Sequence, residues 1–183
     1  MSDTSTLVPT GTWNVDPAHS RVGFAVKHLG IATVRGVFKE FEGSLEIGED
    51  LASTKARGTV QTASVDTSEP SRDGHLRGPD FFDVESYPEI TFESTSIEAA
   101  GEDEWKVLGN LTIHGVTNEI ELDVEIGGTE NDPWGNERVG LEASGQISRS
   151  DYGMKFNITL GSGNAAVSDK VKISLDISAV KQA

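Results

Sequence analysis

The residues that could do chemistry in this 183-residue chain are carboxylates and histidines, because the chain has no cysteine. Thirty aspartates and glutamates accompany four histidines, and both residue types can bind metals or transfer protons. No two histidines have the close spacing of a His-x-His or His-Glu-x-x-His motif. Ser20 directly follows His19, so in a strand the two side chains point to opposite faces and cannot form a nucleophile–base pair. We therefore predict no catalytic residue, no metal site and no enzyme.

Polar and aromatic residues are concentrated between Ser71 and Pro88, where two arginines, three aspartates, a histidine and three aromatics occur together. A long irregular stretch in a chain of strands is usually functional, because ordering it costs entropy. We interpret this stretch as a lid that contains a short helix within 69–76. Arginine suits bidentate recognition of a phosphate or another oxygen-rich group. The candidates for binding a ligand head group or holding the lid are His19, Arg72, Asp73, His75, Arg149 and Tyr152.

A structural role is the alternative for each of these candidates. Arg72 and Asp73 are close in sequence and would pair to hold the lid. His19 would fix the turn before the first long strand, with Asp16 as a cap. His75 suits a hydrogen bond within the lid better than a role as a ligand.

The elements that must position these residues are strands. Apolar and polar residues alternate from Arg21 to Lys27 and again from Val171 to Ile177, which is the period of a half-buried strand. Similar segments occur at 34–47, 55–65, 90–96, 105–113, 120–126 and 139–147. About eight strands without helical periodicity predict an all-β chain, an antiparallel barrel or sandwich. The length suits a single domain at 11–183, preceded by a polar, flexible segment at 1–10.

Small residues on the apolar strand faces predict an internal cavity. Gly58, Gly109, Ala143 and Gly145 lie on such faces, and packed cores otherwise avoid voids. A barrel of eight strands either fills with side chains or holds one small ligand, and we favour the ligand. A lining of aliphatic and aromatic residues suits a long or bulky apolar molecule. The predicted lining residues are Phe24, Val26, Phe38, Gly58, Val60, Phe81, Phe82, Phe92, Leu111, Leu141, Ala143, Gly145 and Ile173.

The charge composition limits the partners. Fifteen cations against thirty acids give a formal net charge of −15, whereas nucleic acids and anionic lipid surfaces attract basic proteins. No apolar run is long enough for a membrane helix, so no membrane insertion is expected. The start MSDTSTLVPTG lacks the basic and apolar regions of a secretory signal. We expect a cytoplasmic protein if Met1 is the native start, and an exported one if a signal has been removed.

Five segments in order resemble the YceI-like family of lipid- or polyisoprenoid-binding proteins, and together they cover nearly the whole chain after the first ten residues. They are WNVDPAHSRVGFAVKHLG (13–30), VRGVFKEFEG (34–43), RDGHLRGPDFFDVESYPEITF (72–92), LGNLTIHGVTNEIELDV (108–124) and ISRSDYGM (147–154). The resemblance implies an extended lipocalin-like antiparallel barrel with a long isoprenoid or related lipid in its central cavity.

The residue pattern and the resemblance together give one functional hypothesis. The protein binds and sequesters or carries a long apolar lipid, of the polyisoprenoid or isoprenoid-quinone type first and fatty acyl second, and needs no other cofactor. Phe81 and Phe82 are the favoured lid contacts. The alternative is a protein-interaction or structural module with a filled barrel, and a hydrolase or metal-dependent enzyme is less favoured. A homodimer that covers an apolar mouth is a further prediction.

Overall fold

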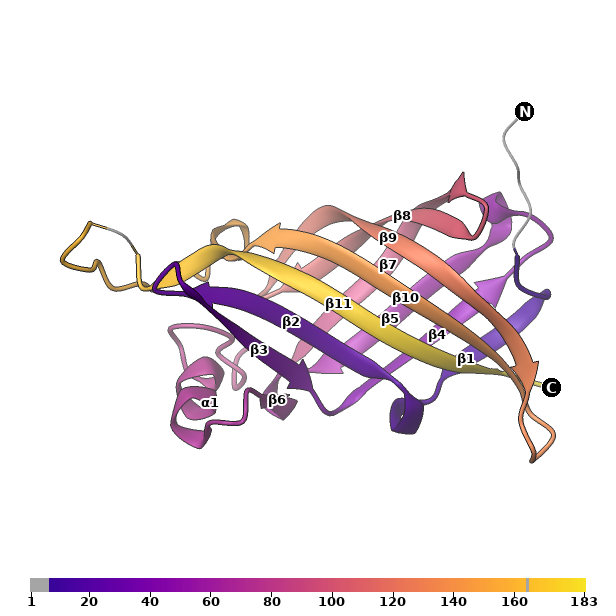
Figure 1. The fold of residues 1–183 in the computed structure, drawn as a ribbon, viewed down its shortest axis with the longest axis horizontal. Helices are drawn as coiled ribbons and strands as arrows, with labels where there is room; N and C mark the ends of the chain where they lie inside the picture. The colour runs from indigo at the N-terminus through magenta and orange to yellow at the C-terminus, as the bar shows by residue number, and fades with distance from the viewer. Residues whose placement is uncertain (1–6, 164) are drawn as a thin grey trace.

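The computed structural model describes residues 7–163 and 165–183, which form a β-barrel with one short α-helix beside one end (Figure 1). The strands are β1 (Gly11–Val15), β2 (Arg21–His28), β3 (Ala32–Phe38), β4 (Phe41–Ile47), β5 (Lys55–Gln61), β6 (Val65–Asp66), β7 (Glu89–Gly101), β8 (Glu104–Ile113), β9 (Val116–Asn131), β10 (Glu137–Ser148) and β11 (Val167–Lys181). The helices are α1 (Pro70–Arg77) and the 3₁₀ turns η1 (Pro17–His19), η2 (Leu51–Ser53), η3 (Thr62–Ser64) and η4 (Arg149–Tyr152). None of these helices has the length and apolar character needed to cross a lipid bilayer.

Antiparallel neighbours close the barrel. Around the wall the order is β1, β4, β5, β7, β8, β9, β10 and β11, and β11 returns to pair with β1. The long strand β11 also pairs with β2, so β1 and β2 lie end to end along it. In the same way β3 pairs with β2, and β4 pairs with β1. The prediction of an all-β, eight-stranded antiparallel barrel with a short helical insert is confirmed.

The structure corrects the predicted strand at 34–47, which is two strands rather than one. It is interrupted at Lys39 and Glu40, whose backbone N–H groups donate to the carbonyl and hydroxyl oxygens of Ser64 (3.2 and 3.0 Å). These bonds take the place of ladder bonds to a neighbouring strand, so pairing stops between β3 and β4.

The sequence prediction omitted β1, because Trp13 and Val15 alone mark its inner face and two residues are too short a pattern. Within the predicted flexible segment, residues 1–6 lie outside the described part of the chain. Val8 is only 3% exposed and belongs to the same packed cluster as Trp13.

Two packed clusters fill the two ends of the barrel. At the end where β1 meets β11, the side chains of Trp13, Val139 and Ala179 are completely buried. The other cluster includes Leu76 and Phe82 of the lid packed against barrel residues. The barrel therefore has a closed end, formed by strands, and a lid end, covered by the irregular insert.

The lid follows β6 and begins with α1. The Glu69 side chain caps this helix by accepting a hydrogen bond from the Arg72 backbone N–H, and Pro70 occupies the first turn, where no N–H is needed. After the helix the chain turns back, and the Phe82 N–H donates to the Leu76 carbonyl (2.9 Å). This turn brings the lid aromatics toward the barrel.

Candidate functional site

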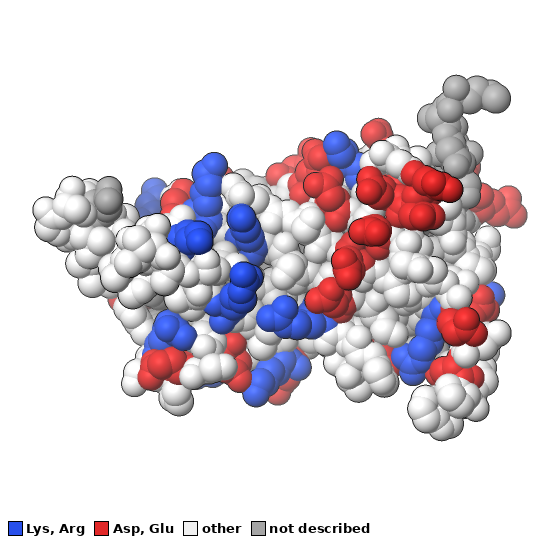
Figure 2. All heavy atoms as spheres, in the orientation of Figure 1, with Lys and Arg blue, Asp and Glu red and all other residues white. Residues whose placement is uncertain are grey.

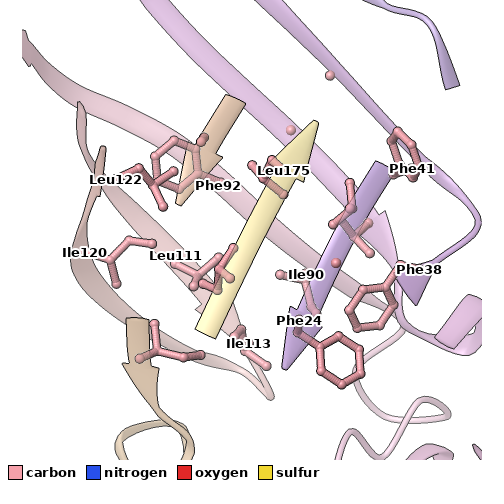
Figure 3. Close-up of a pocket in the computed structure, with 18 of the residues that line it drawn as sticks. Phe24, Phe38, Phe41, Ile90, Phe92, Leu111, Ile113, Ile120, Leu122 and Leu175 are labelled. Atoms are coloured by element: carbon pink, nitrogen blue, oxygen red, sulfur yellow. The ribbon is translucent and has the colours of Figure 1, made fainter. Parts of the chain in front are cut away.

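The barrel encloses a cavity of about 300 Å³. Figure 3 shows aromatic and aliphatic side chains from several strands pointing into this one space. Charged residues are few in the lining, and two of them, Glu42 and Arg57, are exposed to solvent, which leaves Arg149 as the buried one. The interior therefore offers an almost entirely apolar surface.

Most of the predicted lining residues lie along this cavity. They are Phe24, Val26, Phe38, Gly58, Val60, Phe81, Phe82, Phe92, Leu111, Leu141, Ala143 and Ile173. The sequence prediction missed several others, among them Phe41, Ile90, Ile113, Ile120, Leu122, Met154 and Leu175. Strand alternation could have found most of these, but Met154 lies in an irregular segment after η4 that carries no such pattern.

The structure corrects the prediction that Gly145 lines the cavity, because Gly145 is absent from the lining. A Cβ atom built there would lie 2.8 Å from Leu122 Cδ2 and 3.1 Å from the Glu121 carbonyl oxygen. Leu122 on the neighbouring strand already occupies the space that the missing side chain would take. The Phe92 ring covers Gly109 in the same manner.

Gly58 is different, because it leaves open space. A Cβ atom there would meet only the Glu42 carbonyl oxygen, at 3.5 Å, which is an ordinary contact. Gly58 pairs with Gly43 across β4 and β5, and both residues line the cavity. The wall at Gly58 therefore has no side chain filling the interior, whereas at Gly43 the Val15 side chain lies 3.1 Å from where a Cβ atom would be.

The lid end of the cavity is closed by aromatic and sulfur-containing side chains. Phe82 contacts Phe38 edge-on with ring centroids 5.5 Å apart, and Phe38 contacts Phe24 at the same distance. Phe81 and Met154 are buried and also line the cavity. These contacts come from the lid and the segment after η4, whereas the opposite end is sealed by strand residues.

Arg149 lies at the lid end and is 5% exposed. Its guanidinium donates to the carbonyl oxygens of Ser168, Met154, Phe156 and Val167, at 2.8 to 3.2 Å. No carboxylate of the described residues forms an ion pair with it. Burial lowers the pKa of Arg149 from its ordinary value. The site thus combines an apolar cavity with one buried cation.

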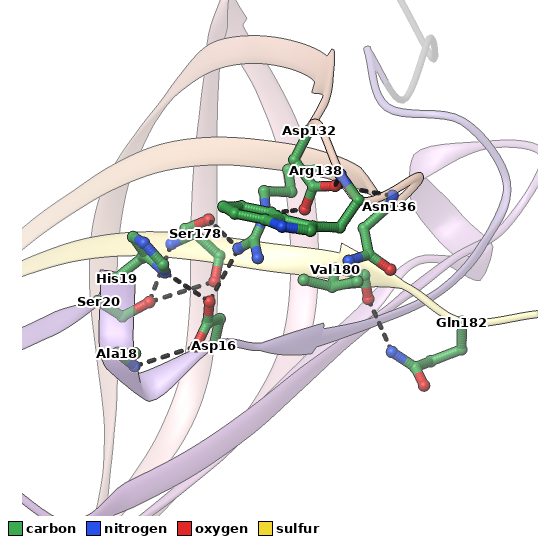
Figure 4. A network of polar contacts seen from close by, with 11 residues as sticks. Asp16, Ala18, His19, Ser20, Asp132, Asn136, Arg138, Ser178, Val180 and Gln182 are labelled. Atoms are coloured by element: carbon green, nitrogen blue, oxygen red, sulfur yellow. Dashed lines mark hydrogen bonds and ion pairs between the residues drawn. The ribbon is translucent and has the colours of Figure 1, made fainter.

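His19 does not join this site. Its Nδ1 lies 2.7 Å from Asp16 Oδ2, and the same carboxylate accepts a hydrogen bond from Arg138 Nη1 at 2.8 Å (Figure 4). Asp16 also caps η1 by accepting from the Ala18 N–H (3.0 Å). Hydrogen bonds from Arg138 and His19 lower the pKa of Asp16 to about 2. His19 is largely exposed and lies outside the cavity lining, so its contacts fix the corner between β1 and β2.

Arg72 and Asp73 hold the start of the lid, but through Thr67 rather than each other. The Arg72 guanidinium donates to the Thr67 hydroxyl (2.7 Å) and carbonyl (2.8 Å). The buried Asp73 carboxylate accepts from the Thr67 N–H (2.9 Å) and hydroxyl (2.5 Å). The predicted direct pair is therefore replaced by a shared partner.

The remaining candidates also make contacts near the lid end. His75 Nε2 lies 2.9 Å from Asp80 Oδ2, and its ring packs edge-on against Phe81 and Phe156. Tyr152 is 1% exposed, and burial raises the pKa of its phenol. Neither residue is in the cavity lining. Among the described residues, no three His, Asp or Glu side chains are grouped to hold a metal ion.

Comparison with known proteins shows which proteins share this barrel. Protein YceI of Salmonella arizonae is 40% identical over 165 residues, covering 90% of this chain and 83% of the relative. The crystal structure of Burkholderia cenocepacia BcnA is similar with a TM-score of 0.76 and 26% identity, covering 90% of this chain and 98% of that one. A polyisoprenoid-binding domain from Saccharophagus degradans, described as implicated in plant cell wall breakdown, has the same fold, with a TM-score of 0.70 at 18% identity and coverage of 93% and 98%. Residues 13–179 match the YceI-like domain, and the chain therefore belongs to the YceI-like family.

Proposed function

We propose that the protein sequesters or carries one long, slim apolar lipid of the polyisoprenoid type inside the barrel, without catalysing a reaction on it. The observation that carries the proposal is the apolar cavity that extends from the lid to the closed end. A filled barrel, as in a pure interaction module, would leave no such space. The polyisoprenoid-binding domain that shares the fold supports the choice of lipid class.

Hydrocarbon burial supplies the affinity. Each buried methylene contributes about 0.8 kcal/mol, so ten of them contribute about 8 kcal/mol before the costs of binding, a scale that corresponds to micromolar affinity. A cavity of about 300 Å³ is at the small end of ligand pockets, which favours a single narrow chain over a bulky ligand. Because methylenes carry no directional groups, chain length is discriminated more strongly than chain identity.

Arg149 is the proposed contact for an oxygen-rich head group. Four of its five N–H groups donate to backbone carbonyls, so one donor remains for a ligand. Arg149 forms no direct ion pair within the described residues, although the charge of Asp169 acts on it, and a buried cation of this kind gains from an anionic ligand because the pair offsets its desolvation. A phosphate at the lid end would therefore bind there, with its chain extending toward the closed end.

Entry and release require the lid to move, because the closed end is sealed by fully buried strand residues. Phe81 and Phe82 are the lid residues that would separate from the cargo. The lid is held at its start by the Thr67 contacts, so motion is expected beyond α1. Phe38, on the barrel wall, would then lose its contact with Phe82.

The test is purification without detergent, followed by solvent extraction and mass spectrometry of the released lipid. A near-stoichiometric isoprenoid or acyl lipid supports the carrier. An empty extract, with no thermal shift on adding polyprenyl phosphates or isoprenoid quinones, refutes it and favours a protein-interaction module.

The head-group assignment has its own test. The wild type should bind a polyprenyl phosphate more tightly than the polyprenol of the same chain length, and Arg149→Met should remove that preference. Equal binding of the two lipids by the wild type would refute the assignment even if the variant folds poorly.

A further inference from the structure

Three large apolar side chains are exposed at the lid end. Ile31 is 83% exposed and Leu29 is 39% exposed, both in the turn between β2 and β3, and Ile158 is 59% exposed in the segment after η4. Two backbone hydrogen bonds connect these segments: the Leu29 N–H donates to the Ala166 carbonyl (2.8 Å), and the Ala166 N–H donates to the Ile158 carbonyl (2.9 Å). The three side chains therefore belong to one tip, which extends beyond the barrel wall (Figure 1). We name Leu29, Ile31 and Ile158 the apolar tip.

The backbone of this tip includes a residue in an unfavourable conformation. Leu29 has a φ of +56°, in the left-handed region, where glycine or asparagine is the usual choice in a tight hairpin turn. A leucine in this conformation is unfavourable, and its exposure adds unfavourable hydration. Strained residues are enriched at functional sites, so this one points to a role for the tip.

Cations lie on the barrel wall beside the apolar tip, although the chain as a whole is strongly acidic. Figure 2 shows Lys and Arg gathered on the barrel wall beside the tip, with some Asp and Glu at the lid below them, whereas most Asp and Glu on this face lie toward the other end. Four exposed cations lie on the outer face of β11, β2 and β3 near this end: Lys27, Arg35, Lys170 and Lys172. None of the four makes an ion pair within the described residues.

The sequence around the tip is depleted of acids in the same way. Residues 17–39 contain four cations and no Asp or Glu, and residues 152–168 contain Lys155 and no acid. The nearby Asp169 carboxylate accepts hydrogen bonds from the Ser150 N–H and hydroxyl (both 2.9 Å), and Asp151 is exposed beside it. The outer face of β11, β2 and β3 beside the tip is therefore basic despite the net charge of −15, whereas the lid on the other side of the tip carries the exposed acids Glu69, Asp80, Glu85 and Glu89.

We infer that the apolar tip and its cations dock the lid end onto an anionic lipid bilayer. Exposed Ile and Leu side chains enter the region between head groups and acyl chains, while Lys and Arg contact anionic head groups. Docking would place the mouth of the cavity against a membrane from which a lipid can enter. The inference therefore rests on the proposed function and adds the route by which the lipid reaches the cavity. It concerns peripheral binding through a loop tip and requires no membrane-spanning segment.

The test is cosedimentation of the full chain with vesicles that contain no polyisoprenoid. We compare vesicles of phosphatidylcholine alone with vesicles of equal parts phosphatidylcholine and phosphatidylglycerol, at low and high salt. The wild type should bind the anionic vesicles and not the neutral ones, and high salt should weaken binding. Ile31→Ser with Ile158→Ser, and separately Lys170→Glu with Lys172→Glu, should each lower binding by about tenfold or more.

The matched control is Trp134→Ser. Trp134 is 77% exposed in the loop between β9 and β10, at the end of the barrel opposite to the apolar tip, so it tests whether any exposed apolar loop suffices (Figure 1). This variant should bind vesicles like the wild type. Absence of wild-type binding at low salt, or equal binding by the tip variants, would overturn the inference.

Three further outcomes separate the docking inference from a contact between two copies and from the proposed function. If the tip variants abolish self-association in size-exclusion chromatography and the wild type binds no vesicles, the apolar tip is a contact between two copies and the docking inference fails. If the purified protein contains lipid but binds no vesicles, docking fails while the proposed function stands. An empty barrel that still binds vesicles refutes the proposed function and leaves the docking surface in place.

Discussion

Filling the cavity from its wall should expel the lipid while keeping the fold. Gly58 is the position for this test, because a side chain there enters the cavity and its Cβ makes only an ordinary contact with the Glu42 carbonyl oxygen (3.5 Å). Gly58→Leu adds four carbon atoms to the interior. At about 0.8 kcal/mol for each cargo methylene displaced, the variant loses up to about 3 kcal/mol of lipid binding, which is about 100-fold in affinity.

The control is the same substitution on the outer face of the barrel. Gly140 in β10 is exposed, and a Cβ atom there would have no atom within 4 Å. Gly140→Leu therefore has a similar effect on the unfolded chain and on strand propensity without entering the cavity. Lipid content is measured by extraction and mass spectrometry, and affinity by titration of delipidated protein with a fluorescent polyprenyl analogue.

The expected result has two parts. Gly58→Leu loses bound lipid, whereas Gly140→Leu retains it. The lipid-free Gly58→Leu protein should also unfold at a higher temperature than the lipid-free wild type, because the new side chain fills empty apolar space. If Gly58→Leu is folded by circular dichroism and still carries the wild-type amount of lipid, the cavity is not the binding site.

Three further predictions concern other parts of the barrel. Gly145→Ala should lower the free energy of unfolding by about 1–3 kcal/mol in urea titrations, because the new methyl group lies 2.8 Å from Leu122 Cδ2; an unchanged midpoint would contradict the packing described. Phe82→Ala removes an aromatic lid contact and should speed lipid release by up to about tenfold in a transfer assay to acceptor vesicles, and a wild-type rate would show that the lid side chain does not retain the cargo. The Asp16 carboxyl has a pKa lowered from 3.8 to about 2 by Arg138 and His19, so its contribution to stability is present above the unfolded pKa and is lost as pH falls from about 5 to about 2. Asp16→Asn should therefore be less stable than the wild type at neutral pH, and the gap in melting temperature should close near pH 2; a constant gap would argue against the linkage.

The sequence predicts the inner wall well, because strand alternation is a local property. Leu111 and Ile173 alternate with polar residues and Phe24 alternates with small ones, and each of the three lies along the cavity. Whether a small residue leaves a void depends on its neighbours across strands, which alternation does not reveal. Gly58 and Gly145 look equivalent in sequence, yet Leu122 covers Gly145 and nothing covers Gly58.

Polar contacts were harder to predict, because they join segments that are distant in sequence. Asp16 was expected to cap a turn, and it does, but its strongest partner is Arg138 on β10. Arg149 was recognised as a possible phosphate contact, but its four backbone carbonyl acceptors follow from the path of the irregular segment after η4. The separation of basic and acidic residues over the surface likewise depends on which strands become neighbours. It cannot be predicted from the net charge or from residue counts.

The pairing of β11 has a consequence for how this chain is synthesised. The last strand lies beside β10, β1 and β2, so it joins the two ends of the chain, with Lys181 opposite Trp13. The wall cannot close until residues 167–181 have left the ribosome, and until then the strand edges of β2 and β10 have no partner. Contacts of such long sequence separation make closure slow relative to local hairpins. A nascent chain that lacks these fifteen residues therefore exposes an apolar inner face, and premature termination in β11 should produce aggregation rather than a smaller folded barrel.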